Sequence, residues 1–190
     1  PVKMYDMEKT PKPIIETQRL MLRCLTDDDL PAFALMNSDP EVMTYFPSTV
    51  DEQTTMSMIR SEQDNYRQEG YCLFACVLKE TAEFIGFVGL HKVGFEIHFA
   101  PAVEVGWRLV KAHWNQGYAT EAALVVIDFG FSEIGLQEIV SFTARQNKAS
   151  IRVMEKCGLT RSFDDDFLHP NLKRTDHLAP HVLYRVVVPG

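Results

Sequence analysis

The junction between residues 102–110 and residues 116–135 constrains the fold of this chain more than any other stretch. The first run, AVEVGWRLV, is rich in β-branched and apolar residues and predicts a strand. The two runs meet at a Gly–x–Ala turn, Gly117 to Ala119, which opens the second run. That run predicts a long helix, because apolar residues recur on one helical face: Ala119, Ala122, Ala123, Val126 and Ile127.

The turn predicts an anion-binding cradle. The first four N–H groups of a helix lack partners within it, and the macrodipole places partial positive charge there. Gly117 and Ala119 carry little or no side chain, so a pyrophosphate can approach the backbone closely. Glu121, one turn into the helix, suits the same end of the dipole. The turn is neither a G-x-G-x-x-G fingerprint nor a Walker A loop. A small-residue helix start that only packs on a sheet is the alternative interpretation.

The rest of the pattern predicts one mixed α/β (α+β) domain over residues 14–190, after a flexible leader at residues 1–13. Further helices are expected at residues 50–69, ended by Gly70, and at residues 147–158. Strands are expected at residues 16–25, 71–79, 83–93, 137–144, 159–163 and 181–188. A long connection at residues 164–180 shows no periodicity, so we expect an irregular loop with a functional role or disorder.

Composition and charge exclude several classes of partner. The chain is 46% hydrophobic and 24% charged, as in ordinary globular domains. Its formal net charge of -7 argues against a nucleic acid or an anionic membrane as partner. No apolar run approaches the roughly 20 residues that span a bilayer, and the leader lacks the apolar region of a secretory signal. We therefore expect a protein that does not enter membranes.

Cysteine and histidine usage points to a reducing compartment and to no metal. The four cysteines, Cys24, Cys72, Cys76 and Cys157, are scattered without C-x-x-C spacing. Free buried thiols fit a cytoplasmic location. The histidines show no metal-ligand spacing, so no metal site and no catalytic histidine is expected.

The stretch W-N-Q-G-Y-A-T-E-A resembles the acetyl-CoA pyrophosphate loop of the GNAT superfamily, whose pattern is Q/R-x-x-G-x-G/A. Trp114 occupies the first position of that pattern, which resembles the RimJ/RimL-type branch of N-terminal acetyltransferases. Matches follow the same order along the chain: E-T-Q-R-L-M-L-R, D-P-E-V-M-T-Y-F, F-I-G-F-V-G-L, N-K-A-S-I-R-V-M-E-K-C-G-L, and F-L-H-P with H-V-L-Y-R.

The resemblance implies a central, mostly antiparallel sheet with splayed middle strands and flanking helices. It implies acetyl-CoA as co-substrate, with the pantetheine arm bonded to the backbone of Trp107 and Leu109 in the strand Val103 to Val110. Asn147 would bond the pantetheine amide, and it is also a favoured helix N-cap. The diphosphate would be held by Asn115, Gln116, Gly117, Tyr118, Ala119 and Thr120.

The resemblance also implies direct attack of a neutral amine on the thioester. Met154 replaces the Tyr acid of many relatives, and Ser150 matches the Ser that protonates the thiolate in the RimL-like branch. A plain helical serine is the alternative. Glu104 is the candidate base, acting directly or through water, unless it only pairs with a nearby Lys or Arg. A backbone N–H near Val105 or Trp107 is the candidate oxyanion donor.

The acceptor is expected to be a primary amine, and deprotonation cost favours a protein or peptide N-terminus. An α-amine costs about 1.4 kcal/mol to neutralise at pH 7, whereas lysine costs about 4.6 kcal/mol. A small-molecule amine (a polyamine, amino acid or antibiotic), an inactive CoA-binding module and an unrelated α/β fold stay open as alternatives. Carboxylates at residues 164–166, with His169, are candidates to meet a cationic acceptor. The apolar stretch FEIHFAP is a candidate homodimer interface.

Overall fold

The computed structural model describes residues 12–188. Most of the leader expected at residues 1–13 thus lies outside the described residues. Nine strands in the described part form one sheet in the order β1-β2-β3-β4-β5-β6-β9-β7, with β8 paired to β9. The strands are β1 Ile15–Glu16, β2 Leu20–Arg23, β3 Leu73–Leu78, β4 Phe84–Lys92, β5 Val103–Leu109, β6 Glu138–Ala144, β7 Thr160–Arg161, β8 Phe167–Leu168 and β9 Pro180–Val187.

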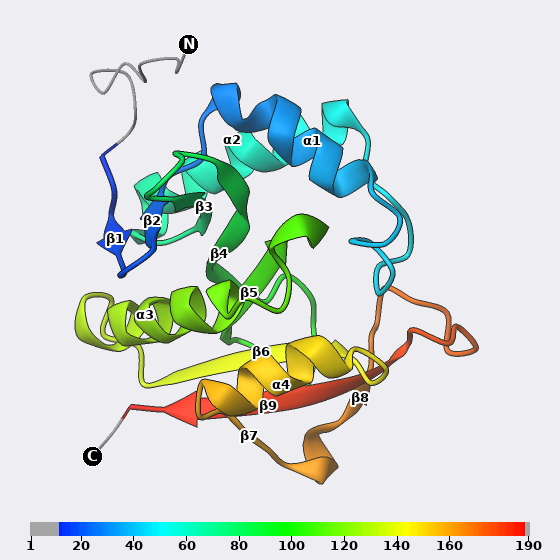
Figure 1. Cartoon of the computed structure of the whole chain (residues 1–190). Helices are drawn as coiled ribbons and strands as arrows, with labels where there is room; N and C mark the ends of the chain where they lie inside the picture. The colour runs from blue at the N-terminus through cyan, green and yellow to red at the C-terminus, as the bar shows by residue number, and fades with distance from the viewer. Residues whose placement is uncertain (1–11, 189–190) are drawn as a thin grey trace.

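Helices cover both faces of the sheet, with α1 and α2 together on one side and α3 and α4 on the other (Figure 1). Leu73 and Ala75 of β3 pack with Ile59 of α2, whereas Phe74 packs with Val126 of α3. Because β3 is buried on both faces, its sequence is a continuous apolar run, LFACVL. The helices are α1 Leu30–Ser38, α2 Glu52–Glu69, α3 Tyr118–Ser132 and α4 Lys148–Lys156.

Local signals fix the helix expected at residues 50–69. The Asp51 carboxylate caps α2 by accepting from the N–H of Thr54 at 2.7 Å. Gly70 ends it in the left-handed conformation, with φ 78°. Ile59 is fully buried on its inner face. Neither α2 nor any other described helix is both long and apolar enough to cross a membrane.

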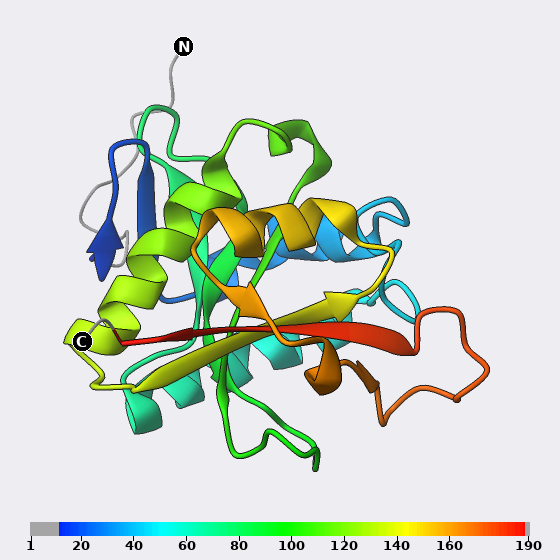
Figure 2. The ribbon, with the colours of Figure 1, turned by 90° about the horizontal axis from the view of Figure 1, so that it is seen from below.

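The strands β5 and β6 diverge in the middle of the sheet. They form the one parallel pair among the described strands, and they share a single register pair, Glu104 with Val140. Beyond it, the Ser141 hydroxyl donates to the carbonyl of Val105 at 2.9 Å. In Figure 2, β4 and β5 run across the direction of β6 and β9. The expected fold, a mostly antiparallel sheet with splayed middle strands and flanking helices, is confirmed.

Two loop expectations need correction. Residues 164–180 are irregular for most of their length, as expected, but they include the two-residue strand β8, which pairs antiparallel with β9. FEIHFAP is not an exposed apolar patch, because Phe99 is buried and Phe95 packs beside it. Phe99 and Phe167 of β8 share one apolar cluster with Val140. These contacts join distant parts of the chain, so no local periodicity signals them. The homodimer stays a prediction, but FEIHFAP no longer serves as its candidate interface.

Close contact between strands leads to a stability prediction. A Cβ added to Gly89 of β4 would lie 2.0 Å from the carbonyl oxygen of Cys72 and 2.6 Å from the Cα of Leu73. We expect Gly89→Ala to lower the free energy of unfolding by about 3 kcal/mol, because backbone atoms must move apart. Gly94→Ala is the control, since its Cβ meets nothing within 4 Å. Urea unfolding of both variants measures the difference; equal, small losses would contradict the close approach.

Candidate active site

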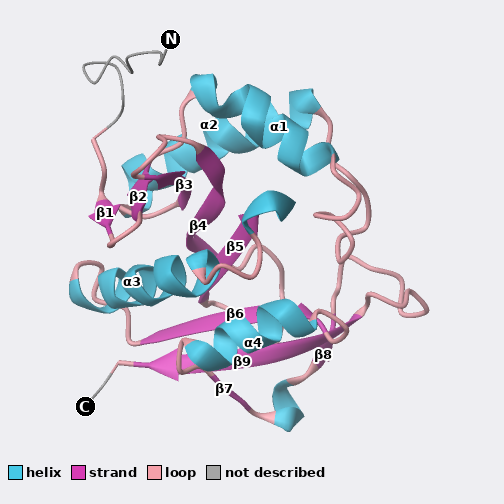
Figure 3. Cartoon of the chain, viewed as in Figure 1, coloured by secondary structure: helices cyan, strands magenta, loops and turns pink. Residues whose placement is uncertain are grey.

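The loop between β5 and α3 forms an amide nest, which we define as residues 115–120. A short 3-10 turn, Lys111–His113, follows β5, and the chain then reaches the start of α3 (Figure 3). Asn115 and Gly117 have positive φ values of 59° and 82°. No side chain caps α3, and the backbone amides of residues 116–120 donate no hydrogen bond within the described part of the chain. Unpartnered N–H groups at a helix N-terminus can bind an anion, so this loop is a candidate anion site.

Arg19, in the turn between β1 and β2, contacts the nest through hydrogen bonds. Its Nε donates to the Glu121 carboxylate at 2.7 Å, and its Nη1 donates to the carbonyl of Gln116 at 3.0 Å. The guanidinium carbon lies 4.2 Å from the ring centroid of Tyr118. The Thr17 hydroxyl also donates to Glu121, at 2.6 Å. Sequence reasoning missed Arg19, because its partners lie about a hundred residues further along the chain.

These bonds set the charge of Glu121. Burial alone would raise the pKa of its carboxyl, but the bonds from Thr17 and Arg19 outweigh burial and hold the pKa below its ordinary value. The carboxylate is therefore ionised, and the guanidinium of Arg19 compensates it. An anion bound in the nest would therefore lie near the neutral Arg19–Glu121 ion pair and not near an uncompensated carboxylate.

Trp114 ties the nest to the end of β5. Its indole Nε1 donates to the carbonyl of Leu109 at 2.8 Å. Trp114 is 39% exposed, so it is not a core residue. The indole needs an acceptor, and the unpaired end of β5 supplies one. The Leu109 carbonyl is thereby occupied, and its N–H is the group left for a ligand.

The backbone of β5 presents polar groups to the gap beside β6. On the other side, the N–H of Val110 donates to the carbonyl of Ile85, next to β4, at 2.9 Å. Backbone groups of successive strand residues point to opposite neighbours. Trp107 and Leu109 therefore direct their N–H groups toward β6, where the strands have separated. This geometry suits an extended ligand that bonds as an additional strand.

Asn147, Ser150 and Thr143 form a polar cluster at the start of α4. Asn147 is the N-cap, and its Oδ1 accepts from the N–H of Ser150 at 3.2 Å. Its Nδ2 donates to the hydroxyl oxygens of Ser150 and Thr143, both at 3.0 Å. The proton of the Ser150 hydroxyl is thus free to serve another acceptor. Met154, one turn further, is buried in the core.

The side chain of Glu104 lies on the opposite face of β5 from α3. Val105 packs in the core beneath α3, so Glu104, Gly106 and Arg108 face the layer of α1 and α2. Glu104 is 8% exposed. Its partner is His91, whose Nε2 lies 2.9 Å from Oε2 of Glu104, and not a Lys or Arg. Histidine spacing gave no sign of this pair, so no catalytic histidine was expected from the sequence.

The Glu104 carboxylate changes the acidity of His91. Burial would lower the pKa of the imidazole, but the charge and hydrogen bond of Glu104 outweigh burial and raise it above the ordinary value. Together the two side chains form a carboxylate–imidazole pair that can hold and release one proton. We call it the Glu104–His91 pair.

Arg108 lies on the same face of β5 as Glu104 and contacts α1 and the segment that follows it. Its Nη1 donates to Oδ1 of Asn37 in α1 at 2.6 Å, and its guanidinium lies 4.2 Å from the ring centroid of Phe46. Phe46 belongs to the segment between α1 and α2. Burial lowers the pKa of Arg108 to about 10, so it remains charged at neutral pH.

The acidic run after β7 is engaged internally. Asp165 accepts from Nε of Arg185 at 3.1 Å, and Asp166 accepts from Nε of Arg161 at 3.0 Å. His169 packs against the ring of Phe95 rather than beside these carboxylates, with ring centroids 4.8 Å apart. Neither carboxylate is free to meet a cationic acceptor, because each is paired with an arginine of the same domain.

Comparison with known proteins identifies the family. The model of the family described as "Acetyltransferase (GNAT) domain" matches residues 19–160. "Uncharacterized protein YkkB" of Bacillus subtilis (strain 168) is 37% identical over 144 residues, which is 75% of this chain and 83% of that protein. "Uncharacterized N-acetyltransferase YoaA" of the same organism is 32% identical over 151 residues, which is 78% of this chain and 84% of that protein.

Solved structures share the fold. The GNAT-family acetyltransferase of Bacillus anthracis superposes with a TM-score of 0.76 at 26% identity, covering 91% of this chain and 97% of that one. RimL, a ribosomal L7/L12 α-N-protein acetyltransferase solved with coenzyme A, gives a TM-score of 0.75 at 14% identity, over 93% of this chain and 98% of that one. The chain therefore belongs to the GNAT acetyltransferase family and is an acetyl-CoA-dependent N-acetyltransferase.

Proposed function

We propose that this enzyme is of the RimJ/RimL type and transfers the acetyl group directly from acetyl-CoA to the N-terminal α-amine of a protein or peptide. One observation carries the proposal: the amide nest opens beside the gap between β5 and β6, with Ser150 at the start of α4 and Glu104 on the far face of β5. A thioester in that gap would have an acid candidate and a base candidate from separate layers of the fold.

The residues present fit coenzyme A. The diphosphate would accept from the amides of the nest, Asn115 to Thr120, including Gln116, Tyr118 and Ala119. The backbone N–H groups of Trp107 and Leu109 would bond the pantetheine arm. Both Nδ2 protons of Asn147 are engaged, so it would contribute through the second lone pair of Oδ1. Acetyl-CoA supplies the activated acetyl group.

Ser150 would protonate the leaving thiolate. Asn147 donates to its oxygen, so the hydroxyl proton is free to point toward the sulfur. A donated hydrogen bond also makes the hydroxyl a better proton donor. Met154 offers no proton, which leaves Ser150 as the acid at this end of α4.

Glu104 would remove a proton from the acceptor, directly or through water. An acceptor ammonium must lose one proton before its nitrogen attacks the thioester carbon. A second proton leaves the nitrogen after attack, while the sulfur gains one, so each turnover releases one proton to solvent. A buried carboxylate with a single imidazole partner suits the first step.

The cost of deprotonation favours an α-amine. Neutralising it at pH 7 costs about 1.4 kcal/mol, against about 4.6 kcal/mol for lysine. A site with one carboxylate as its base is better matched to the smaller cost. RimL, by its name, acts on an α-amine of a ribosomal protein, and its fold is shared here.

We expect Gly117→Val to weaken acetyl-CoA binding at least about tenfold, roughly 1.4 kcal/mol. A branched side chain would cover the nest amides, and valine disfavours the φ of 82°. Gly135→Val is the matched control, because Gly135 also has positive φ, 78°, but lies beyond α3. Calorimetric titration compares them. Equal affinity in the two variants would remove the nest from the binding site.

Ser150→Ala should lower kcat about 100-fold while the Kd of acetyl-CoA changes less than about threefold. The acid is lost, whereas alanine suits the first turn of a helix. Ser57→Ala in α2, whose exposed hydroxyl donates to the carbonyl of Gln53, should leave both constants unchanged. Release of free CoA thiol measures kcat. If kcat and affinity fell together for Ser150→Ala, Ser150 would be structural.

An acceptor panel tests the amine class. We expect kcat/KM for a peptide with a free α-amine to exceed at least about tenfold that for the same peptide blocked at its N-terminus but bearing lysine. Spermidine, free amino acids and aminoglycosides complete the panel. Preference for one of these would establish the small-molecule alternative, and tight acetyl-CoA binding without turnover of any amine would indicate an inactive CoA-binding module.

A further inference from the structure

The two members of the Glu104–His91 pair differ in their exposure to solvent. The two residues are register partners on β5 and β4, and their side chains are 2.9 Å apart. Glu104 has 10% of its side chain exposed, whereas His91 has 35% exposed. The imidazole therefore lies between the buried carboxylate and solvent.

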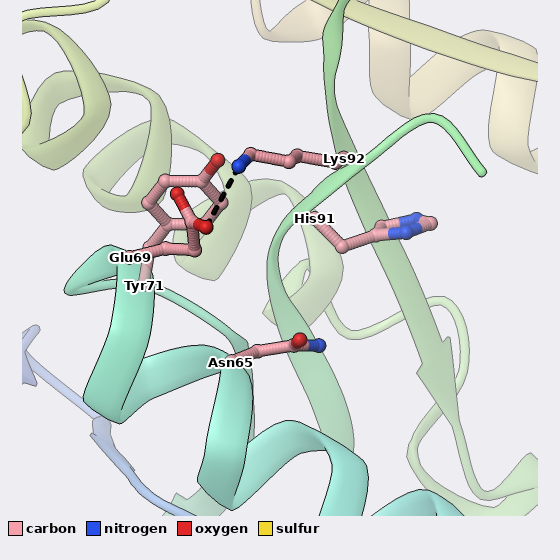
Figure 4. A pocket seen from close by; sticks show the side chains of 5 residues that line it. All are labelled: Asn65, Glu69, Tyr71, His91 and Lys92. Atoms are coloured by element: carbon pink, nitrogen blue, oxygen red, sulfur yellow. Dashed lines mark ion pairs between the residues drawn. The ribbon is translucent and has the colours of Figure 1, made fainter.

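His91 lines a cavity of about 120 Å³ together with Asn65, Glu69, Tyr71 and Lys92. Figure 4 shows Lys92 pointing to Glu69, with which it pairs at 2.7 Å, while His91 and Asn65 point away from that pair. The cavity has room for a few water molecules and polar groups to bond them. Its lining does not include Glu104, so His91 is the member of the pair that meets it.

Open space adjoins the pair above Gly106, on the face of β5 that is opposite α3. A Cβ placed on Gly106 would have Oε1 of Glu104 and Nε2 of His91 as its nearest neighbours, both at 3.9 Å. An amine above Gly106 would therefore meet the carboxylate directly or through one water. The space above Gly106 thus adjoins both members of the pair, whereas the cavity is lined by His91 alone of the two.

We propose that His91 is the proton outlet of the acetyl transfer: it takes the acceptor proton from Glu104 on Nε2 and releases a proton from its other ring nitrogen to solvent, because its side chain is the more exposed of the two and lines the cavity. This rests on the proposed role of Glu104 as base. The ammonium loses one proton to Glu104, which passes it to His91 and is again a carboxylate, ready for the next turnover. An imidazole suits this step because it has two ring nitrogens and titrates near neutral pH.

The charges around His91 act in one direction on its protonation. Glu104 on β5 and Glu62 on α2 both raise the pKa of His91, and a backbone group of Lys92 does so as well. Lys92 itself is neutralised by Glu69 of α2. Only the neutral imidazole can take up another proton, so kcat should rise as pH rises through the pKa of His91, centred above about 6.5.

His91→Gln tests the outlet. Glutamine can still donate to Glu104 but carries no titratable proton. With a peptide that has a free α-amine, at saturation, we expect kcat at pH 7 to fall about tenfold, less than the loss of the base itself would cause, and the rise above pH 6.5 to disappear. The Kd of acetyl-CoA should stay unchanged. The solvent deuterium isotope effect on kcat should grow, since proton release becomes slower.

Lys92→Gln is the matched control, because Lys92 lines the same cavity but points to Glu69. It should keep the kcat and pH profile of the wild type. His91→Asn serves as a second variant if His91→Gln unfolds. A folded His91 variant that keeps the kcat and pH profile of the wild type would refute the role of His91 as proton outlet. If Glu104→Gln were at the same time slowed about 100-fold, Glu104 would remain the proposed base. An unchanged Glu104→Gln enzyme would instead refute the proposed base.

Discussion

The separation of β5 from β6 is the constraint on which the rest of the site depends. These strands share one register pair, Glu104 with Val140, inside an otherwise antiparallel sheet. A central strand would normally satisfy its backbone groups on both sides, and buried unpaired groups are costly. Past Val105, β5 has lost its neighbour, so Trp107 and the N–H of Leu109 face a gap. A ligand with amide groups of its own is the partner that such an edge requires.

The same divergence arranges the chemistry around the gap. The nest, at the start of α3, closes one end, where Arg19 and Trp114 hold it to β2 and β5. Ser150 approaches from the layer of α4, and the Glu104–His91 pair approaches from the opposite face. The proposed acid and the proposed base thus lie on opposite faces of the sheet. A thioester between the strands could be attacked from one side while its sulfur is protonated from the other.

Much of the fold was predictable because its signals are local. The α2 helix carries its own cap and stop, Asp51 and Gly70, and the turn at Gly117 stands directly before α3. Features that depend on register or tertiary contact were not predictable. Only the pairing of β4 with β5 brings His91 beside Glu104, and only the packed fold brings Arg19 to the nest. The residue types were visible in the sequence, but their neighbours were not.

Hydrogen exchange at the nest amides, with and without coenzyme A, tests the central claim most directly. If the diphosphate accepts from residues 116–120 and the pantetheine arm from β5, saturating coenzyme A should slow exchange at those amides and at Trp107 and Leu109. Amides of α2, on the other face of the sheet, should exchange as before. Protection confined to other elements, or no change at residues 116–120, would contradict the assignment of this loop and gap as the coenzyme site.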